Sequence, residues 1–241
     1  MTVVFAFSVR ALLGERRTLA LLLFSFAAGA IALLTRAAGD PFFRENDYAD
    51  VVNTLVIPTV TSFIALVVAA SAFGEEREDG SILYLAATPL SRLHLVAAKI
   101  LAAWVTTLVL LVPALLGVAL LGQGVEDAGV GIHLYTWLGV ALAAAAYCAV
   151  FVLLSLTIRR AVIAGILYIA LWEGSIATFA ASAGRLSIGA YARAIAAEGT
   201  PGVTVEGTAD VRPLAALIVL AATIALGTWL AARRFRRMEL P

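Results

Sequence analysis

The sequence predicts an all-α membrane protein with six transmembrane helices, preceded by an N-terminal amphipathic interfacial helix. Two observations carry this prediction. First, 62% of the 241 residues are hydrophobic and only 14% are charged, with a mean hydropathy of +0.99, whereas soluble domains carry about a quarter charged residues. Second, the apolar residues fall into runs long enough to cross a bilayer. Residues 1–241 are expected to form one membrane domain.

Six stretches meet the length requirement of about 20 apolar residues per crossing. They lie at residues 19–35, 51–73, 95–121, 135–158, 161–183 and 213–232. The third stretch contains Pro113, which predicts a kink, because proline removes a backbone donor and crowds the preceding turn. Only Arg159 and Arg160 separate the fourth stretch from the fifth, which predicts a tight turn.

Basic residues predict that both ends of the chain lie in the cytoplasm. Of the 17 Lys and Arg residues, five fall on the proposed outer segments (Arg36, Arg44, Arg185, Arg193 and Arg212) and the others on cytoplasmic segments. The cytoplasmic set is Arg10, Arg16, Arg17, Arg77, Arg92, Lys99, Arg159, Arg160, Arg233, Arg234, Arg236 and Arg237. This bias follows the positive-inside rule.

The first 18 residues are predicted to form a helix in the headgroup plane. Arg10, Gly14 and Arg17 share one helical face, opposite Phe5 and Leu12. A simple extension of the first span is the alternative. A cleaved signal peptide is disfavoured, because the charged region is long and no A-x-A site follows the apolar run.

Catalytic and metal-binding patterns are sparse. His94 and His133 fall at opposite membrane faces, and no Cys/His cluster has metal-ligand spacing. No GxxxxGK[ST] loop is present, so ATP is not expected to be hydrolysed by this chain. Trp172-Glu173-Gly174-Ser175 could suggest an intramembrane serine protease, but no span holds the histidine base that such an enzyme needs. We expect no catalytic residue, metal or cofactor in the chain, and no nucleic-acid partner.

The cytoplasmic connection at residues 74–92 is the most informative stretch. It opens with an acidic run (Glu75, Glu76, Glu78 and Asp79), breaks at Gly80, and continues into the apolar residues 82–87, which end before Pro89. A short amphipathic helix of this kind can dock into a groove on a cytoplasmic partner. It could equally lie on the membrane surface, and the residues alone leave both readings open.

This stretch resembles the signature loop of ABC-2 type transporter permeases. In that family a Gly-ended span is followed by a Glu-x-x-x-Gly-Ser/Thr block, a Leu-rich short helix, Pro-x-Ser-Arg and a lysine in the next span. The matching residues are Gly74, Glu76, Gly80, Ser81, Leu85, Pro89, Ser91, Arg92 and Lys99. Residues 167–173 and 185–191 are similar to a bacterial subgroup of these permeases. The acidic run at residues 75–79 is denser than the family pattern.

The resemblance implies that residues 74–92 contain a short cytoplasmic coupling helix that sits in a cleft of a separate ATP-binding subunit. The ATPase-coupling residues would be Glu75, Glu76, Glu78, Gly80, Ser81, Leu85, Pro89, Ser91 and Arg92. Two permease copies would pair with two ATPase subunits, which bind ATP and Mg, in the bacterial plasma membrane. The resemblance leaves open whether the chain pairs with itself or with a paralogue.

Glu173 is the one carboxylate expected deep in a span. Such a group costs about 2.5–3.5 kcal/mol on insertion scales and should face protein, water or a partner. Together with Trp172 it could belong to the translocation path or to a helix interface. Alternatively it could reach water near the surface or be held protonated. Gly165 with Ile169, and Gly174 with Thr178, offer close helix approach on the same span.

The outer loop at residues 184–212 is expected to hold a short helix at the membrane surface over residues 185–198, followed by a turn-rich segment. This loop is too small for a cargo-binding domain. With few polar residues in the spans, an amphipathic, lipidic or drug-like cargo is favoured, and the similar subgroup also includes ion exporters. A polytopic membrane enzyme and a passive channel or scaffold are the alternative functions.

Overall fold

The computed structural model describes residues 2–14, 16–37, 45–78, 91–122, 130–158, 160–176, 187–199 and 211–237. Within these ranges the elements are helical, and no strand occurs in them. The longer helices are α2 (Arg16–Ala37), α4 (Ser62–Glu78), α6 (Arg92–Gly122), α7 (Val130–Thr157) and α12 (Pro213–Arg236). The shorter ones are α1 (Thr2–Gly14), α3 (Glu45–Asp50), α8 (Ala161–Leu167) and α11 (Ile188–Ala196), with π-helices η1 (Val51–Thr61) and η2 (Tyr168–Ile176) and a 3-10 turn η3 (Ala197–Gly199).

Five helical stretches of the described chain are long and apolar enough to span a membrane. They are Arg17–Leu34, Tyr48–Phe73, Arg92–Leu121, Val130–Thr157 and Pro213–Arg236. The predicted all-α membrane fold is therefore confirmed. The predicted span at residues 161–183 is described only as far as residue 176, where Ala161–Glu173 forms a shorter apolar helix. The sixth crossing stays a prediction.

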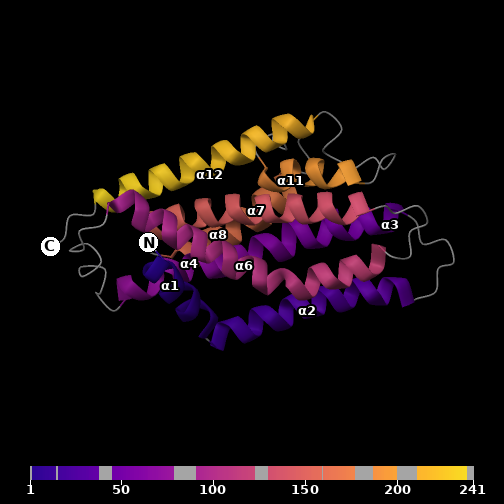
Figure 1. Ribbon diagram of the computed structural model, residues 1–241, viewed down its shortest axis with the longest axis horizontal. Helices are drawn as coiled ribbons and strands as arrows, with labels where there is room; N and C mark the ends of the chain where they lie inside the picture. Colours follow the sequence, from indigo (N-terminus) through magenta and orange to yellow (C-terminus); the bar gives the residue numbers. More distant parts are fainter. Residues whose placement is uncertain are drawn as a thin grey trace.

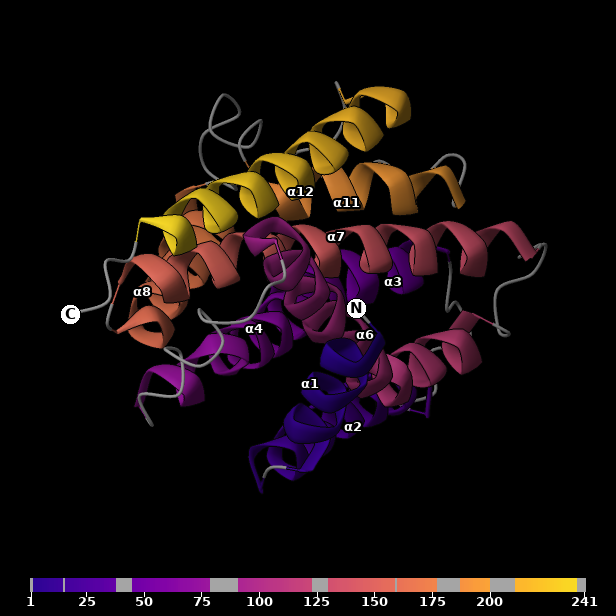
Figure 2. The same cartoon turned by 60° about the vertical axis from the view of Figure 1, so that its left-hand side comes forward.

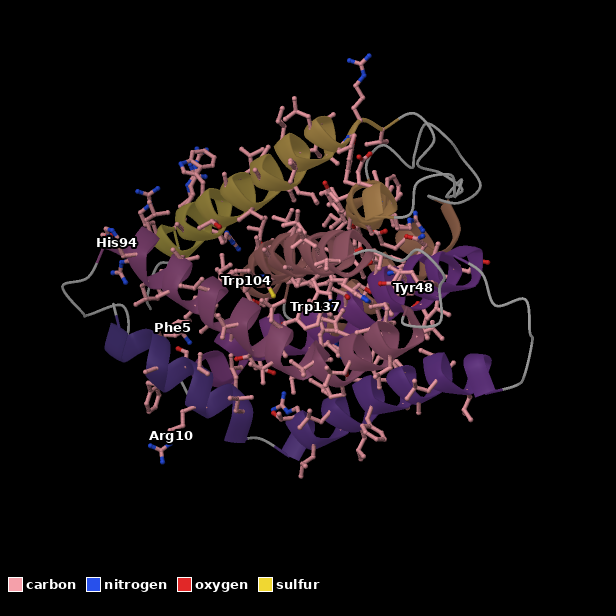
Figure 3. All side chains as sticks on the ribbon, turned by 45° about the vertical axis from the view of Figure 1, so that its right-hand side comes forward. Phe5, Arg10, Tyr48, His94, Trp104 and Trp137 are labelled. Carbon is pink, nitrogen blue, oxygen red and sulfur yellow. The ribbon has the colours of Figure 1, made fainter. Side chains whose placement is uncertain are left out.

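The long helices lie side by side along the longest axis of the molecule (Figure 1). The end of α4, the start of α6, helix α1 and the end of α12 gather at one end, which we call the basal end. His94, Phe5 and Arg10 lie toward this end in Figure 3, whereas Tyr48 lies toward the opposite end. Residues that flank the 74–92 connection and both terminal helices thus share one end of the bundle.

Helix α1 is separate from the first span and runs obliquely to α2 (Figure 1). It packs against α6, with Leu12 buried and Arg10 exposed. The Thr18 hydroxyl donates to the Leu12 carbonyl at 2.6 Å, which holds the corner between the two helices. The alternative of one extended first span is therefore wrong. Of the predicted apolar arc, Phe5 is half-buried and Leu12 is buried, whereas Phe7, on the face that carries Arg10, is 73% exposed.

Two prolines disturb the spans in different ways. Pro113 lies inside α6, whose ribbon changes direction part-way along (Figure 1), as the sequence predicts. The neighbouring Ala114 N–H donates to the Ser25 hydroxyl of α2 at 3.2 Å. Pro58 lies inside η1, where the Thr59 hydroxyl donates to the Thr54 carbonyl at 3.3 Å. Wide π turns of this kind are common at functional sites.

Glycines bring helices into close contact at two places. A Cβ on Gly117 of α6 would lie 2.5 Å from the Gly29 Cα of α2, so the two backbones touch. A Cβ on Gly165 of α8 would lie 2.1 Å from a methyl carbon of Leu66 on α4. The expected close approach at Gly165 is therefore present. Gly174 lies in η2, and its predicted partner position Thr178 lies outside the described residues.

Helix α11 departs from the surface helix that the sequence predicts. It lies between α12 and α7 in both Figure 1 and Figure 2, and it contacts both. Eight of its nine residues are buried, with Tyr191 half-buried. Gly139 of α7 permits this contact, because a Cβ there would lie 2.7 Å from the Ala192 carbonyl oxygen. The predicted helix exists, but its small side chains let it pack inside the bundle.

Candidate functional site: the coupling connection and a buried carboxylate

The 74–92 connection is described only at its two ends. Helix α4 continues to Glu78, so Glu75, Glu76 and Glu78 lie on its last turns, although their side chains are not described. The predicted residues Gly80, Ser81, Leu85 and Pro89 lie outside the described chain. Ser91 and Arg92 open α6 at the basal end.

Ser91 is the cap of α6. Its hydroxyl accepts from the His94 N–H at 3.4 Å, and its carbonyl accepts from the Leu95 N–H at 3.1 Å. The Ser91 hydroxyl is also hydrogen-bonded to His94 Nδ1. A serine at this position satisfies a backbone donor that the first helical turn leaves free. Ser91 therefore fixes where the connection ends and the span begins.

Helices α2 and α6 contact α4 just before the connection starts. The Arg17 Nη1 atom of α2 donates to the Ser71 hydroxyl at 3.4 Å. Lys99 of α6, only 4% exposed, donates from Nζ to the Ala72 carbonyl and lies 4.7 Å from the Phe73 ring centroid. A buried ammonium is stabilised by such carbonyl and ring contacts. Three consecutive residues of α4 thus meet two other helices.

A third helix joins this group through its last turn. Phe235 of α12 is 5% exposed, and its ring centroid lies 5.7 Å from that of Phe73. The Arg92 guanidinium carbon lies 5.4 Å from the Phe235 ring centroid. We call the set the basal collar; it consists of Arg17, Ser71, Ala72, Phe73, Arg92, Lys99 and Phe235. It joins the α4 flank of the connection to α2, and it joins both flanks to α12.

Glu173 lies in η2 and is 2% exposed. Its Oε1 atom accepts from the N–H of Ile188 at 3.0 Å, the N–H of Gly189 at 3.5 Å and the Tyr168 hydroxyl at 3.2 Å. Its Oε2 atom accepts from the Ser187 hydroxyl at 2.5 Å. A carboxylate suits these free amides, because the N-terminus of a helix carries partial positive charge. Glu173 therefore caps the buried helix α11.

Gly189 makes this contact possible. A Cβ at position 189 would lie 2.8 Å from Glu173 Oε2 and 3.3 Å from the Tyr147 hydroxyl. Ser187 also accepts from the Ala190 N–H at 3.0 Å, as an N-cap residue does. The predicted neighbour Trp172 is half-buried, and no described hydrogen bond joins it to this group.

Several buried polar atoms around α11 have no hydrogen-bond partner among the described residues. They include Asn53 Oδ1 of η1, the Tyr147 hydroxyl of α7 and Arg193 Nε of α11. Arg193 makes one described hydrogen bond, from Nη1 to the Asn53 carbonyl at 3.5 Å. Buried polar atoms of this kind are commonly satisfied by internal water. The region around η1, η2 and α11 therefore gathers several buried polar groups.

The sequence model of a family described as ABC-2 family transporter protein matches residues 16–172. The chain belongs to the ABC-2 transporter family. The matched range includes the four spans from α2 to α7 and the whole 74–92 connection. Glu173, α11 and α12 follow the matched range. No curated protein matches the chain.

Membership of this family bears directly on the 74–92 connection. An ABC-2 permease works with an ATP-binding ABC partner, so the resemblance to the signature loop is confirmed at the level of the family. The described residues contain no group of three His, Cys, Asp or Glu side chains that could hold a metal ion.

Sequence reasoning missed the partners of Glu173 in this permease. The segments at 167–173 and 185–191 are separate motifs in the sequence, and the hydrogen bonds of Glu173 with Ser187, Ile188 and Gly189 bring them together. Their presence as two motifs of one subgroup was a signal that they meet. The basal collar had no comparable signal, since Phe235 lies far along the chain from Phe73.

Proposed function

We propose that this chain is the membrane-spanning subunit of an ATP-driven ABC exporter. Its 74–92 connection docks on a cytoplasmic ATPase subunit, and two copies of the chain pair with two such subunits. ATP and Mg bind the partner, so this chain catalyses no reaction. The observation that carries the proposal is the family match across residues 16–172, which spans the connection and the helices that flank it.

The basal collar supports a mechanical role for the connection. Phe73 and Arg92, which flank it, both contact Phe235. A displacement of the docked segment therefore passes directly into packed helices, and packed interiors transmit displacement because they deform little. The movement would reach α4 and α6 as a rigid-body shift, which is a common form of switching in proteins.

In this proposal the basal end faces the cytoplasm. Arg10 lies toward this end in Figure 3, and the start of α6, with Arg92, and the last turn of α12, with its basic residues, meet there in Figure 1. Single cysteines at Ser91 and Val130, in a Cys148→Ala background, test the orientation. A membrane-impermeant maleimide added outside intact cells should label Val130→Cys and spare Ser91→Cys. Labelling of Ser91→Cys alone would contradict it.

The coupling role is tested by charging the connection. Leu85→Glu, or deletion of residues 81–87, should leave the protein in the membrane but abolish co-purification with the ATPase subunit and its stimulated ATP hydrolysis. Val130→Glu is the matched control, because Val130 is 84% exposed at the opposite end. Unchanged co-purification and stimulation in the Leu85 variant would refute the coupling role.

We further propose an amphipathic, lipidic or drug-like cargo. The described bundle presents apolar side chains on its outer faces, including Leu116 of α6 and Ile218 of α12, so a cargo passing along it meets mainly hydrocarbon. The buried polar atoms without a described partner include Arg193 Nε, Asn53 Oδ1 and the Tyr147 hydroxyl. Reconstituted complex should hydrolyse ATP faster when such a compound is added; stimulation by a simple salt alone would favour an ion cargo.

A further inference from the structure

The basal collar concentrates contacts from three helices on one short piece of α4. Ser71 receives Arg17 of α2, Ala72 receives Lys99 of α6, and Phe73 receives Phe235 of α12. These three residues are consecutive, and they precede the end of α4 at Glu78 by less than two helical turns. The root of the connection is therefore tied to the first span, the third span and the last span at one level.

Phe235 is the member of the basal collar that lies farthest along the chain from the 74–92 connection. It lies on the final turn of α12, and its ring contacts the Phe73 ring on one flank of the connection and the Arg92 guanidinium on the other. A ring in this position is held by two different forces. Aromatic pairing acts toward Phe73, and attraction of the cation to the ring face acts toward Arg92.

Elsewhere α12 packs along α7, α6 and α11 and leaves much of its surface uncovered. It is the least buried of the five candidate spans in the described chain. Its face toward α7 includes Gly227, where a Cβ would lie 3.0 Å from the Ala149 Cβ, and small residues of this kind give a smooth contact. A helix with an exposed face and a smooth contact can shift as a unit when one end is pulled.

We propose that Phe235 is a positioning residue that makes α12 a moving part of the coupling machinery. When the ATPase displaces the connection, Phe73 and Arg92 carry Phe235 with them, and the basal end of α12 moves relative to α7. This inference rests on the proposed function. It goes further because it assigns the ATP-driven movement to the last span, which lies outside the family-matched range.

The first experiment measures distances by spin labelling in the complete complex, with a Cys148→Ala background. Labels at Ser91→Cys and Arg237→Cys report the collar, and labels at Val130→Cys and Arg237→Cys report α12 against the far end of α7. ATP binding should leave the first distance unchanged and shift the second. A shift of the first distance with no shift of the second overturns the inference.

The second experiment separates positioning from simple packing. Phe235→Leu keeps an apolar side chain but removes the ring, so ATP should no longer shift the 130–237 distance, and permease-dependent stimulation of ATP hydrolysis should fall. Phe235→Tyr restores the ring and should restore both. Phe151→Leu on α7 is the matched control: this ring is also buried and pairs with Tyr147 at 5.8 Å, but it lies outside the collar.

Failure of the proposed function can be distinguished from failure of the inference about Phe235. If the wild-type chain does not co-purify with an ATPase subunit, the proposed function fails and the inference falls with it. If the complex forms and Phe235→Leu retains full stimulation, or if Phe151→Leu lowers stimulation equally, the inference alone is refuted. Spin labels in the free permease add a check that needs no partner: Phe235→Leu should broaden the 91–237 distance distribution, and an unchanged distribution counts against the collar.

Discussion

Arg193 on α11 donates to the backbone carbonyl of Asn53 in η1, at 3.5 Å and across 140 residues of chain. Pro58 explains why that carbonyl is free. In a π-helix the N–H of a residue bonds to the carbonyl five residues earlier, so position 58 would serve Asn53. Proline has no N–H, and a buried arginine takes its place.

Replacing Arg193 with Met should destabilise the protein. The Asn53 carbonyl would then be buried without its described donor, which costs about 1–3 kcal/mol, so the unfolding midpoint in detergent should fall. Arg212→Met provides the control, because Arg212 is exposed and makes no side-chain cap bond to α12. An equal fall in both variants would show that the Asn53 contact is not the cause.

Pro58→Ala should make the stability of the protein less dependent on Arg193. The new N–H at position 58 can satisfy the Asn53 carbonyl, so Arg193→Met should cost less stability in the Pro58→Ala background than in the wild type. A double-mutant cycle measures this difference, and coupled pairs commonly show about 0.5–3 kcal/mol. Additive effects would indicate that Pro58 and Arg193 act independently.

Glu173→Gln should loosen the start of α11. The four donors would lose a charge-assisted acceptor, and such bonds are roughly twice as strong as neutral ones. Amide hydrogen exchange at Ile188 and Gly189 should accelerate roughly tenfold, which corresponds to a loss of about 1.4 kcal/mol. Glu198→Gln is the control, because Glu198 is exposed in η3. Unchanged exchange would argue against a capping role.

Gly117→Ala should destabilise the contact between α2 and α6. Its new methyl group would lie 2.5 Å from the Gly29 Cα, so the two backbones would have to separate. Overpacking of this kind typically costs about 1–3 kcal/mol. Gly131→Ala in α7 has open space around it and should be neutral or stabilising, because alanine favours helix. Equal unfolding midpoints for the two variants would contradict the expected clash.

The spans could be predicted because each crossing of the hydrocarbon core needs about 20 consecutive apolar residues. Runs at 51–73 and 95–121 match helices that begin and end within a few residues of the predicted limits. The Pro113 bend also followed from local chemistry, since proline cannot donate to the turn before it. Such features depend on residues near one another in the chain.

The polar contacts could not be predicted in the same way. The π turns of η1 and η2 and the burial of α11 depend on contacts between distant segments, such as Arg193 with Asn53 and Glu173 with Ile188. A single sequence shows that Glu173 needs partners, since a buried charge must be compensated. It does not show that the partners are the free amides of a later helix.

The burial of α11 also constrains the order in which the protein assembles. A nine-residue helix that contains Arg193 is too short to cross a bilayer, and its free amides cannot remain unsatisfied in hydrocarbon. Its capping carboxylate lies on η2, and its packing surface lies on α7 and α12. Helix α11 therefore has no stable place until these neighbours have inserted. Its docking therefore follows the insertion of α12, and the docked helix then occupies the space between α12 and α7.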